Sequence, residues 1–301
     1  MSRRRVLNAG ALALGGALLP AFAVRSQSPA IATTDLGGGL FLFQGAGCNV
    51  IALRGDGGAL MIDGGLAANA DALLRAVYAA TGNDRVQTLI ITHWHPEQTG
   101  ANELVGRAGG TIFAHEKTAM YLGSRVTSAL FEGRREALPE VARPKATTRA
   151  EGTLEFPGRR VDYGYLPAAH TDGDLFVHIP ELNVLAAGGV VSAEAWPLLD
   201  FRNGAWFGGR VRAVERLAGL VKPDTRVVPT DGRVLTGRDI VRQRDIYLEL
   251  FTALIGYMNM GLGADDVVER NPLEKYESEF GDASAFLDGA FRSMQIAYVP
   301  D

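Results

Sequence analysis

The chain has 301 residues, of which 47% are hydrophobic, and a formal net charge of −4. A chain of this length and composition can bury one large core, and its acidic balance excludes the basic face that nucleic-acid binding requires. The single cysteine, Cys48, excludes an internal disulfide, and we expect it to be a small buried side chain.

The first 23 residues have the pattern of an export signal. Arginines at positions 3–5 precede an apolar stretch over residues 9–19, and residues 21–23 (Ala-Phe-Ala) have the small-x-small form of a cleavage site. The pattern resembles a twin-arginine signal, which exports folded proteins across the bacterial inner membrane. A membrane anchor is the alternative, but the stretch is shorter than the about 20 residues that span a bilayer. We expect a periplasmic mature chain of residues 24–301 with no membrane insertion after cleavage.

Strands and helices alternate along the next part of the chain. Apolar runs separated by turn residues predict strands at Leu40–Gln44 and over residues 48–54, 59–63, 86–92 and 111–114. Apolar residues three or four positions apart predict helices over residues 69–80 and 100–108 and at Glu116–Leu122. Residues 125–150 are polar and contain two prolines, which favours a long surface loop.

A second strand-rich half covers residues 153–187. It is followed by a helix over residues 210–220, a short strand at Arg226–Pro229 and a helical extension over about 236–301 with a break at residues 271–272. Two strand-rich halves that each carry helices predict an α/β fold with two sheets packed face to face and helices outside, a four-layer αββα sandwich.

Three histidines follow strand-like segments. His93 and His95 lie in the segment THWHPEQTG (92–100) and are two positions apart, so in an extended backbone both side chains point the same way. His170 follows another strand-like run, in the segment AHTDGD (169–174). Three neutral imidazoles and a water form the open tetrahedral ligand set of catalytic zinc.

These segments resemble the motifs of the metallo-β-lactamase superfamily. Residues 92–100 resemble its T-H-x-H-x-D-H-x-G signature, residues 63–65 its preceding Asp-x-Gly turn, and residues 169–174 its G-H-T-x-G-D element. Residues 186–190 and 229–232 fall where the family has a strand ending in Gly-Asp and often Pro-Gly-His-Gly. The resemblance covers about residues 39–236 and implies an αββα metallo-hydrolase, nearest to exported glyoxalase II-like enzymes.

The resemblance also implies that one of two metal sites has been lost. Family members hold the first metal with three histidines, at the positions of His93, His95 and His170. The positions that hold the second metal are occupied here by Glu97, Gln98, Gly189 and Asp231. Glycine has no side chain to bridge the metals, and a neutral amide is a poor zinc ligand. We therefore expect one zinc ion per chain.

The acidic residues near the histidines receive candidate roles. Zinc lowers the pKa of a bound water from about 15.7 towards 7 and polarises a carbonyl or phosphoryl oxygen. Glu97 is the candidate to orient or deprotonate that water, because the family's Asp at this position has a similar role; a solvated loop carboxylate is the alternative. Asp231 would accept a proton from the leaving group, bind a cation or cap a loop. Asp63 is expected to orient a histidine.

Three functional interpretations remain open. The first is a periplasmic one-zinc hydrolase that acts on a small-molecule ester, thioester, lactone or amide. The second is a catalytically inactive binding protein with the same fold, a pseudoenzyme. The third is an altered two-metal hydrolase in which Glu97 and Asp231 favour a harder ion such as manganese or iron. Residues 125–150 and 192–209 are expected to form the pocket walls, and no motif identifies the substrate or an oligomeric state.

Overall fold

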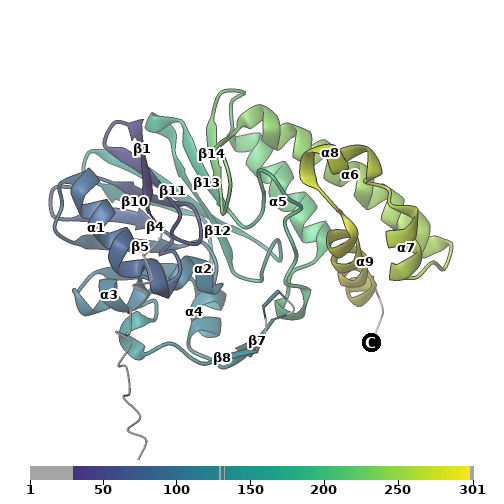
Figure 1. The fold of residues 1–301 in the computed structure, drawn as a ribbon, viewed down its shortest axis with the longest axis horizontal. Helices are drawn as coiled ribbons and strands as arrows, with labels where there is room; N and C mark the ends of the chain where they lie inside the picture. The colour runs from purple at the N-terminus through teal and green to yellow at the C-terminus, as the bar shows by residue number, and fades with distance from the viewer. Residues whose placement is uncertain (1–29, 129, 132, 299–301) are drawn as a thin grey trace, which may run out of the picture.

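The computed structural model describes residues 30–128, 130–131 and 133–298, so the predicted export signal lies outside the described residues. Two sheets form the centre of the molecule, and helices cover both outer faces (Figure 1). The predicted four-layer αββα sandwich is confirmed. No helix of the described part is long and apolar enough to cross a membrane.

The first sheet has seven strands. In spatial order these are β1 (Ala32–Gly37), β2 (Leu40–Gln44), β3 (Val50–Leu53), β4 (Ala59–Ile62), β5 (Val86–Ile91), β6 (Thr111–His115) and β9 (Ala146–Thr148). The first four strands pair antiparallel, whereas β4, β5, β6 and β9 are parallel to one another. The carboxyl ends of these parallel strands therefore meet at one edge of the sandwich.

The second sheet has six strands. In spatial order these are β10 (Gly152–Phe156), β11 (Arg159–Leu166), β12 (Asp174–Ile179), β13 (Val184–Gly188), β14 (Arg226–Pro229) and β15 (Leu235–Thr236). All neighbours are antiparallel except β13 and β14, which are joined through a helix. A short separate ribbon is formed by β7 (Val126–Thr127) and β8 (Arg134–Arg135).

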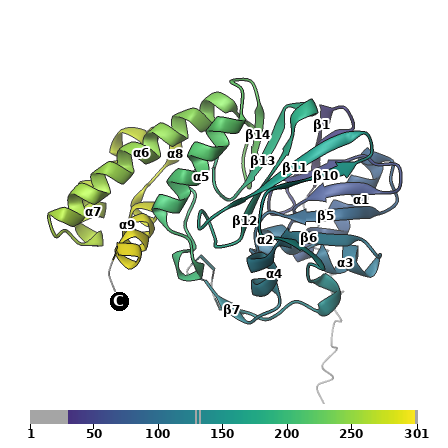
Figure 2. The ribbon, with the colours of Figure 1, turned by 180° about the vertical axis from the view of Figure 1, so that it is seen from behind.

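The helices belong to two groups, one on each outer face (Figures 1 and 2). On the side of the first sheet lie α1 (Ala70–Thr81), α2 (Pro96–Thr99), α3 (Asn102–Arg107) and α4 (Glu116–Leu122). On the side of the second sheet lie α5 (Phe207–Leu220), α6 (Gly237–Asn259), α7 (Ala264–Arg270), α8 (Glu277–Phe280) and α9 (Ser284–Tyr298). A capping box between Thr236 and Asp239 begins α6, which satisfies N–H groups that have no partner within the helix.

Successive side chains of a strand point to opposite faces of the sheet and therefore pack in two different hydrophobic cores. In β3, Ile51 and Leu53 face the second sheet, whereas Val50 and Ala52 pack under α1 and α3. This follows from the two-residue period of a strand, and it explains why β3 and β4 are apolar on both faces. A third core lies between the second sheet and helices α5 to α9.

Some sequence-based boundaries were wrong. Residues 125–150 were expected to be a loop, but they contain β7, β8 and β9, and β9 extends the first sheet at its edge. These strands have two or three residues each, too few for an alternating apolar pattern. The first strand, β1, was missed because its residues are mostly exposed and polar. Helix α5 begins at Phe207, three residues before the predicted start.

Gly100 sets the spacing between the histidine segment and the turn after β4. Its N–H donates to the Gly65 carbonyl at 2.7 Å, and a Cβ at this position would lie 2.2 Å from the backbone of Leu66 and Ala67. Such a contact forces the two backbones apart.

We expect Gly100→Ala to lower the free energy of unfolding by about 1–3 kcal/mol, as overpacking does, measured by urea denaturation. Gly219→Ala is the matched control, since no atom lies within 4 Å of its Cβ and alanine favours the helix. Equal stability of the two variants would contradict the close approach at Gly100.

Candidate metal centre

The three histidines come from loops of both sheets at the same edge of the sandwich. His93 follows β5, His95 precedes α2, and His170 lies between β11 and β12. The two loops are joined directly, because the Leu175 N–H donates to the Thr92 carbonyl at 2.8 Å. The fold therefore brings together residues that are about 75 positions apart in the chain.

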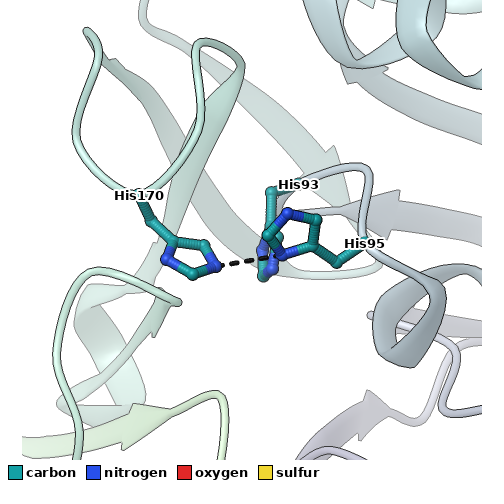
Figure 3. Close-up of side chains that lie close together, drawn as sticks. All are labelled: His93, His95 and His170. Carbon is teal, nitrogen blue, oxygen red and sulfur yellow. Dashed lines mark hydrogen bonds between the residues drawn. The ribbon is translucent and has the colours of Figure 1, made fainter. Parts of the chain in front are cut away.

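The imidazole rings face one another in a buried cluster (Figure 3). Their exposed fractions are 1% for His93, 5% for His95 and 8% for His170, and the ring centroids lie 4.7–4.9 Å apart. One nitrogen of each ring lies within 4.8 Å of the other two. The shortest separation, 3.1 Å, joins His170 Nε2 and His95 Nδ1.

The other nitrogen of each ring has a partner outside the cluster. His95 Nε2 lies 3.0 Å from Asp200 Oδ2, and His170 Nδ1 lies 2.7 Å from the Leu198 carbonyl oxygen. His93 Nδ1 lies 3.0 Å from the Thr92 hydroxyl. An ionised carboxylate and a carbonyl can only accept hydrogen bonds, so His95 and His170 donate outward. Their unprotonated nitrogens therefore face the centre.

This arrangement fits a metal ion. When both rings are neutral, these two nitrogens carry lone pairs 3.1 Å apart, and a proton or a cation between them satisfies both. Zn–N bonds of about 2.0–2.1 Å in a tetrahedron give nitrogen separations of roughly 3.3 Å. Burial, and then the neighbouring rings, hold the pKa values of His93 and His170 well below the ordinary range. Both rings are therefore neutral at pH 7, the form that binds metal.

Asp63 contacts the centre only through Thr92. Its carboxylate accepts the Thr92 N–H at 2.8 Å and the Thr92 hydroxyl at 2.8 and 3.0 Å, and that hydroxyl contacts His93. Burial raises the pKa of Asp63 to about 7, although the bonds from Thr92 oppose this. The expected contact of Asp63 with a histidine is thus replaced by a contact through one intervening hydroxyl.

Two buried residues that position the rings were missed by the sequence analysis. Asp200 is fully buried, and its two oxygens also accept from Asn203 Nδ2 at 2.9 Å. Arg210 is also fully buried and donates to the carbonyls of Ala169, Pro197 and Leu198, which surround His170. Other charged residues follow both closely in the sequence, Arg202 after Asp200 and Arg212 after Arg210, so the sequence carries no signal that these two are the buried ones.

Asp174 fixes the backbone that carries His170. It accepts the N–H groups of His170 and Thr171 at 2.7 and 2.9 Å and the Thr171 hydroxyl at 2.8 Å. Burial raises the pKa of Asp174 to about 6. This carboxylate is therefore a structural residue of the loop.

The positions of the second metal site do not form a ligand set. In the part of the chain that the structure describes, His93, His95 and His170 are the only group of three or more His, Cys, Asp or Glu side chains placed to share an ion. Gln98 donates to the Thr230 hydroxyl at 2.6 Å. A Cβ at Gly189 would lie 2.3 Å from His170 Cδ2, so the histidine ring fills the space of a side chain there.

A pocket of about 360 Å³ opens beside the three histidines. Glu97 and Asp231 both line it, and Asp231 accepts from the Ser192 hydroxyl at 3.2 Å. Its apolar wall is formed by Leu130, Phe131, Ala195, Trp196, Pro197 and Leu198. These residues belong to the two segments expected to form the walls.

The sequence matches the family model described as the metallo-β-lactamase superfamily over residues 44–240, more than half of the chain. The chain belongs to the metallo-β-lactamase superfamily. No curated protein sequence matches it significantly.

Solved structures of superfamily members share the fold at low sequence identity. A metallo-β-lactamase from Pontibacter korlensis is 20% identical, with a TM-score of 0.58, and the match covers 72% of this chain and 99% of that one. The DIM-1 metallo-β-lactamase is 16% identical, with a TM-score of 0.57 and coverage of 73% and 97%. The sec-alkylsulfatase Pisa1 from Pseudomonas sp. is 17% identical, with a TM-score of 0.65 and coverage of 90% and 52%.

Because the Asp200 carboxylate orients His95, we expect Asp200→Asn to weaken zinc binding about 10- to 100-fold, the usual effect of losing such a partner. The dissociation constant would be measured by competition with a chelating dye. Asp231→Asn is the matched control, because Asp231 contacts no histidine in the described hydrogen bonds. An unchanged affinity in Asp200→Asn would contradict the positioning role, and an equal loss in Asp231→Asn would indicate a direct contact of Asp231 with the ion.

Proposed function

We propose that this protein is a periplasmic metal-dependent hydrolase that uses one zinc ion, held by His93, His95 and His170, to split an ester, thioester, lactone or amide. The observation that carries the proposal is the set of inward-facing, unprotonated ring nitrogens beside an open pocket. Zinc at this position would supply a water that ionises near neutral pH and a Lewis acid for the substrate carbonyl.

The residues of the pocket have complementary tasks in this reaction. Glu97 lines the pocket next to the histidine segment and would take the proton of the attacking water. Glu97 would then pass this proton to the leaving group, and Asp231, which also lines the pocket, would orient the substrate. Hydrolysis breaks the bond between the acyl carbon and the leaving group; water gives OH to the acyl carbon and a proton to the leaving group.

The two alternatives receive less support. A second cation would need ligands besides Glu97 and Asp231, and no such group of three is present among the described residues. Binding without catalysis does not require neutral ring nitrogens that point towards an open pocket, so this feature supports the hydrolase more than the pseudoenzyme. Turnover separates the pseudoenzyme from the hydrolase, and metal stoichiometry separates one ion from two.

The alkylsulfatase likeness bears on the architecture of the helical extension. That match covers 90% of the chain. Residues 30–236 make up a smaller share of the chain than this, so the match also includes much of α6 to α9. The β-lactamase matches cover 72–74%. The extension is therefore an architectural feature shared with a sulfatase, although the reaction proposed here is at an acyl carbon.

We expect the zinc-loaded protein to hydrolyse a panel of esters and lactones, a chelator to abolish this turnover, and added zinc to restore it. Glu97→Gln should lower kcat by about 100- to 10,000-fold, the range for a general base. Glu155→Gln removes a carboxylate from an exposed position of β10 and should leave kcat unchanged. Absence of turnover in the zinc-loaded protein would favour the binding protein, and full activity of Glu97→Gln would contradict the role of that residue.

A further inference from the structure

Apart from the histidines, the only charged side chains that line the pocket in the described part of the chain are carboxylates. Glu97 and Asp231 face the pocket with carboxylates, and the remaining polar lining consists of the three histidines and neutral groups such as Gln98, Ser192 and Thr230. Among the residues that the structure describes, no lysine or arginine lines it. A ligand in this pocket therefore meets carboxylates and apolar surface away from the metal position.

Two guanidinium groups lie near the centre, but both are directed elsewhere. Arg210 is fully buried behind His170, and its donors are directed to backbone carbonyls. Arg135 lines a separate cavity, and it donates to the Trp94 carbonyl and to the Thr99 hydroxyl. Its positive charge acts on Glu97 through space and offsets part of that charge, but Arg135 does not line the pocket beside the histidines. Neither group is available to an anion in the pocket.

The opposite wall suits an apolar substrate group. Leu130 and Phe131 come from the segment between β7 and β8, and Phe131 packs edge-on against His95 with ring centroids 6.0 Å apart. Trp196 and Leu198 come from the segment before α5. Apolar area of this kind stabilises a buried alkyl or aryl group by about 25 cal/mol per Å². Away from the three histidines, the pocket thus combines an apolar wall with carboxylates, and no side chain there offers a counter-charge for an anion.

We propose that this pocket selects substrates whose non-reacting part is apolar and neutral or cationic, and that it rejects substrates whose non-reacting part is anionic, such as carboxylate-bearing lactams. An ammonium group on the substrate would lie against Glu97 or Asp231. The inference rests on the proposed function, since it names the substrate class of the same site. The physical reason is that an anionic tail away from the metal position would lose hydration beside two carboxylates and gain no partner there.

Three matched 4-nitrophenyl esters test this selectivity. Their acyl tails end in trimethylammonium, in the isosteric tert-butyl group, or in a carboxylate, so that charge is the main variable. We expect kcat/KM of the wild-type zinc-loaded protein to be highest for the cationic or the neutral ester and at least roughly tenfold lower for the anionic ester, as expected for one repulsive charge near 4 Å. An anionic ester that is hydrolysed as well as the neutral one would overturn the proposal.

A variant that places a cationic side chain in the pocket should reduce the discrimination against anionic substrates. Leu198 lines the pocket and is 38% exposed, and only its backbone carbonyl contacts His170 and Arg210. Leu198→Lys should raise the anionic-to-neutral ratio of kcat/KM by roughly tenfold, whereas the uncharged Leu198→Met should leave that ratio unchanged. The ratio is compared within each variant, so a general loss of activity does not affect it. An unchanged ratio in Leu198→Lys would contradict a selectivity based on charge.

Binding separates this proposal from the hydrolase proposal. Three ketones, in which CH₂ replaces the ester oxygen of each probe, cannot be hydrolysed and are titrated by calorimetry. If the anionic ketone binds most weakly and none of the esters is hydrolysed, the charge-selectivity proposal is supported and the hydrolase proposal is rejected. Turnover without charge preference would retain the hydrolase and reject the selectivity. Ketone binding that ignores charge, or no measurable binding or turnover of any probe, would overturn the selectivity.

Discussion

The metal centre depends on a short separation between one ring nitrogen of His170 and one of His95. His170 Nε2 and His95 Nδ1 lie 3.1 Å apart, and the outward protons of both rings are held by the Leu198 carbonyl and the Asp200 carboxylate. Each ring belongs to a loop of a different sheet, so this contact also fixes how the two halves meet. Two opposed lone pairs are costly in an apolar surrounding, so a proton or a cation is needed between these nitrogens. A metal ion bound by the three neutral rings satisfies all their inward nitrogens at once.

At the positions where a second metal would be expected, space as well as chemistry disfavours an ion. Position 189 has no side chain, and His170 fills the volume that a Cβ would enter, at 2.3 Å from its Cδ2. Gln98 turns its amide to the Thr230 hydroxyl, so this position now joins two loops of the pocket. Replacing Gly189 alone by an acid would displace a ring of the first site before it added a ligand. The site is consistent with one ion beside two carboxylates that line the pocket, Glu97 and Asp231, which can contact water and substrate there.

Sequence patterns predicted the features that depend on local periodicity and on ordered motifs. The two sheets, most of the helices and the grouping of His93 with His95 follow from strand and helix periods, and His170 was added by its motif. Features that depend on contacts between distant segments were missed. Asp200 and Arg210 are 30 and 40 positions beyond His170, and only the fold brings them to it. The short strands β7 to β9 form because neighbouring backbone is available for pairing, which a single segment does not encode.

Zinc stoichiometry tests the central claim most directly. Elemental analysis would be applied to the purified protein and to the double variant His93→Ala/His95→Ala, with circular dichroism to establish that the variant is folded. The three-histidine centre predicts about one zinc per chain in the wild-type protein and almost none in the folded double variant. Near two ions per chain would mean that Glu97 and Asp231 complete a second site, and no bound metal after incubation with zinc would contradict a metal centre altogether.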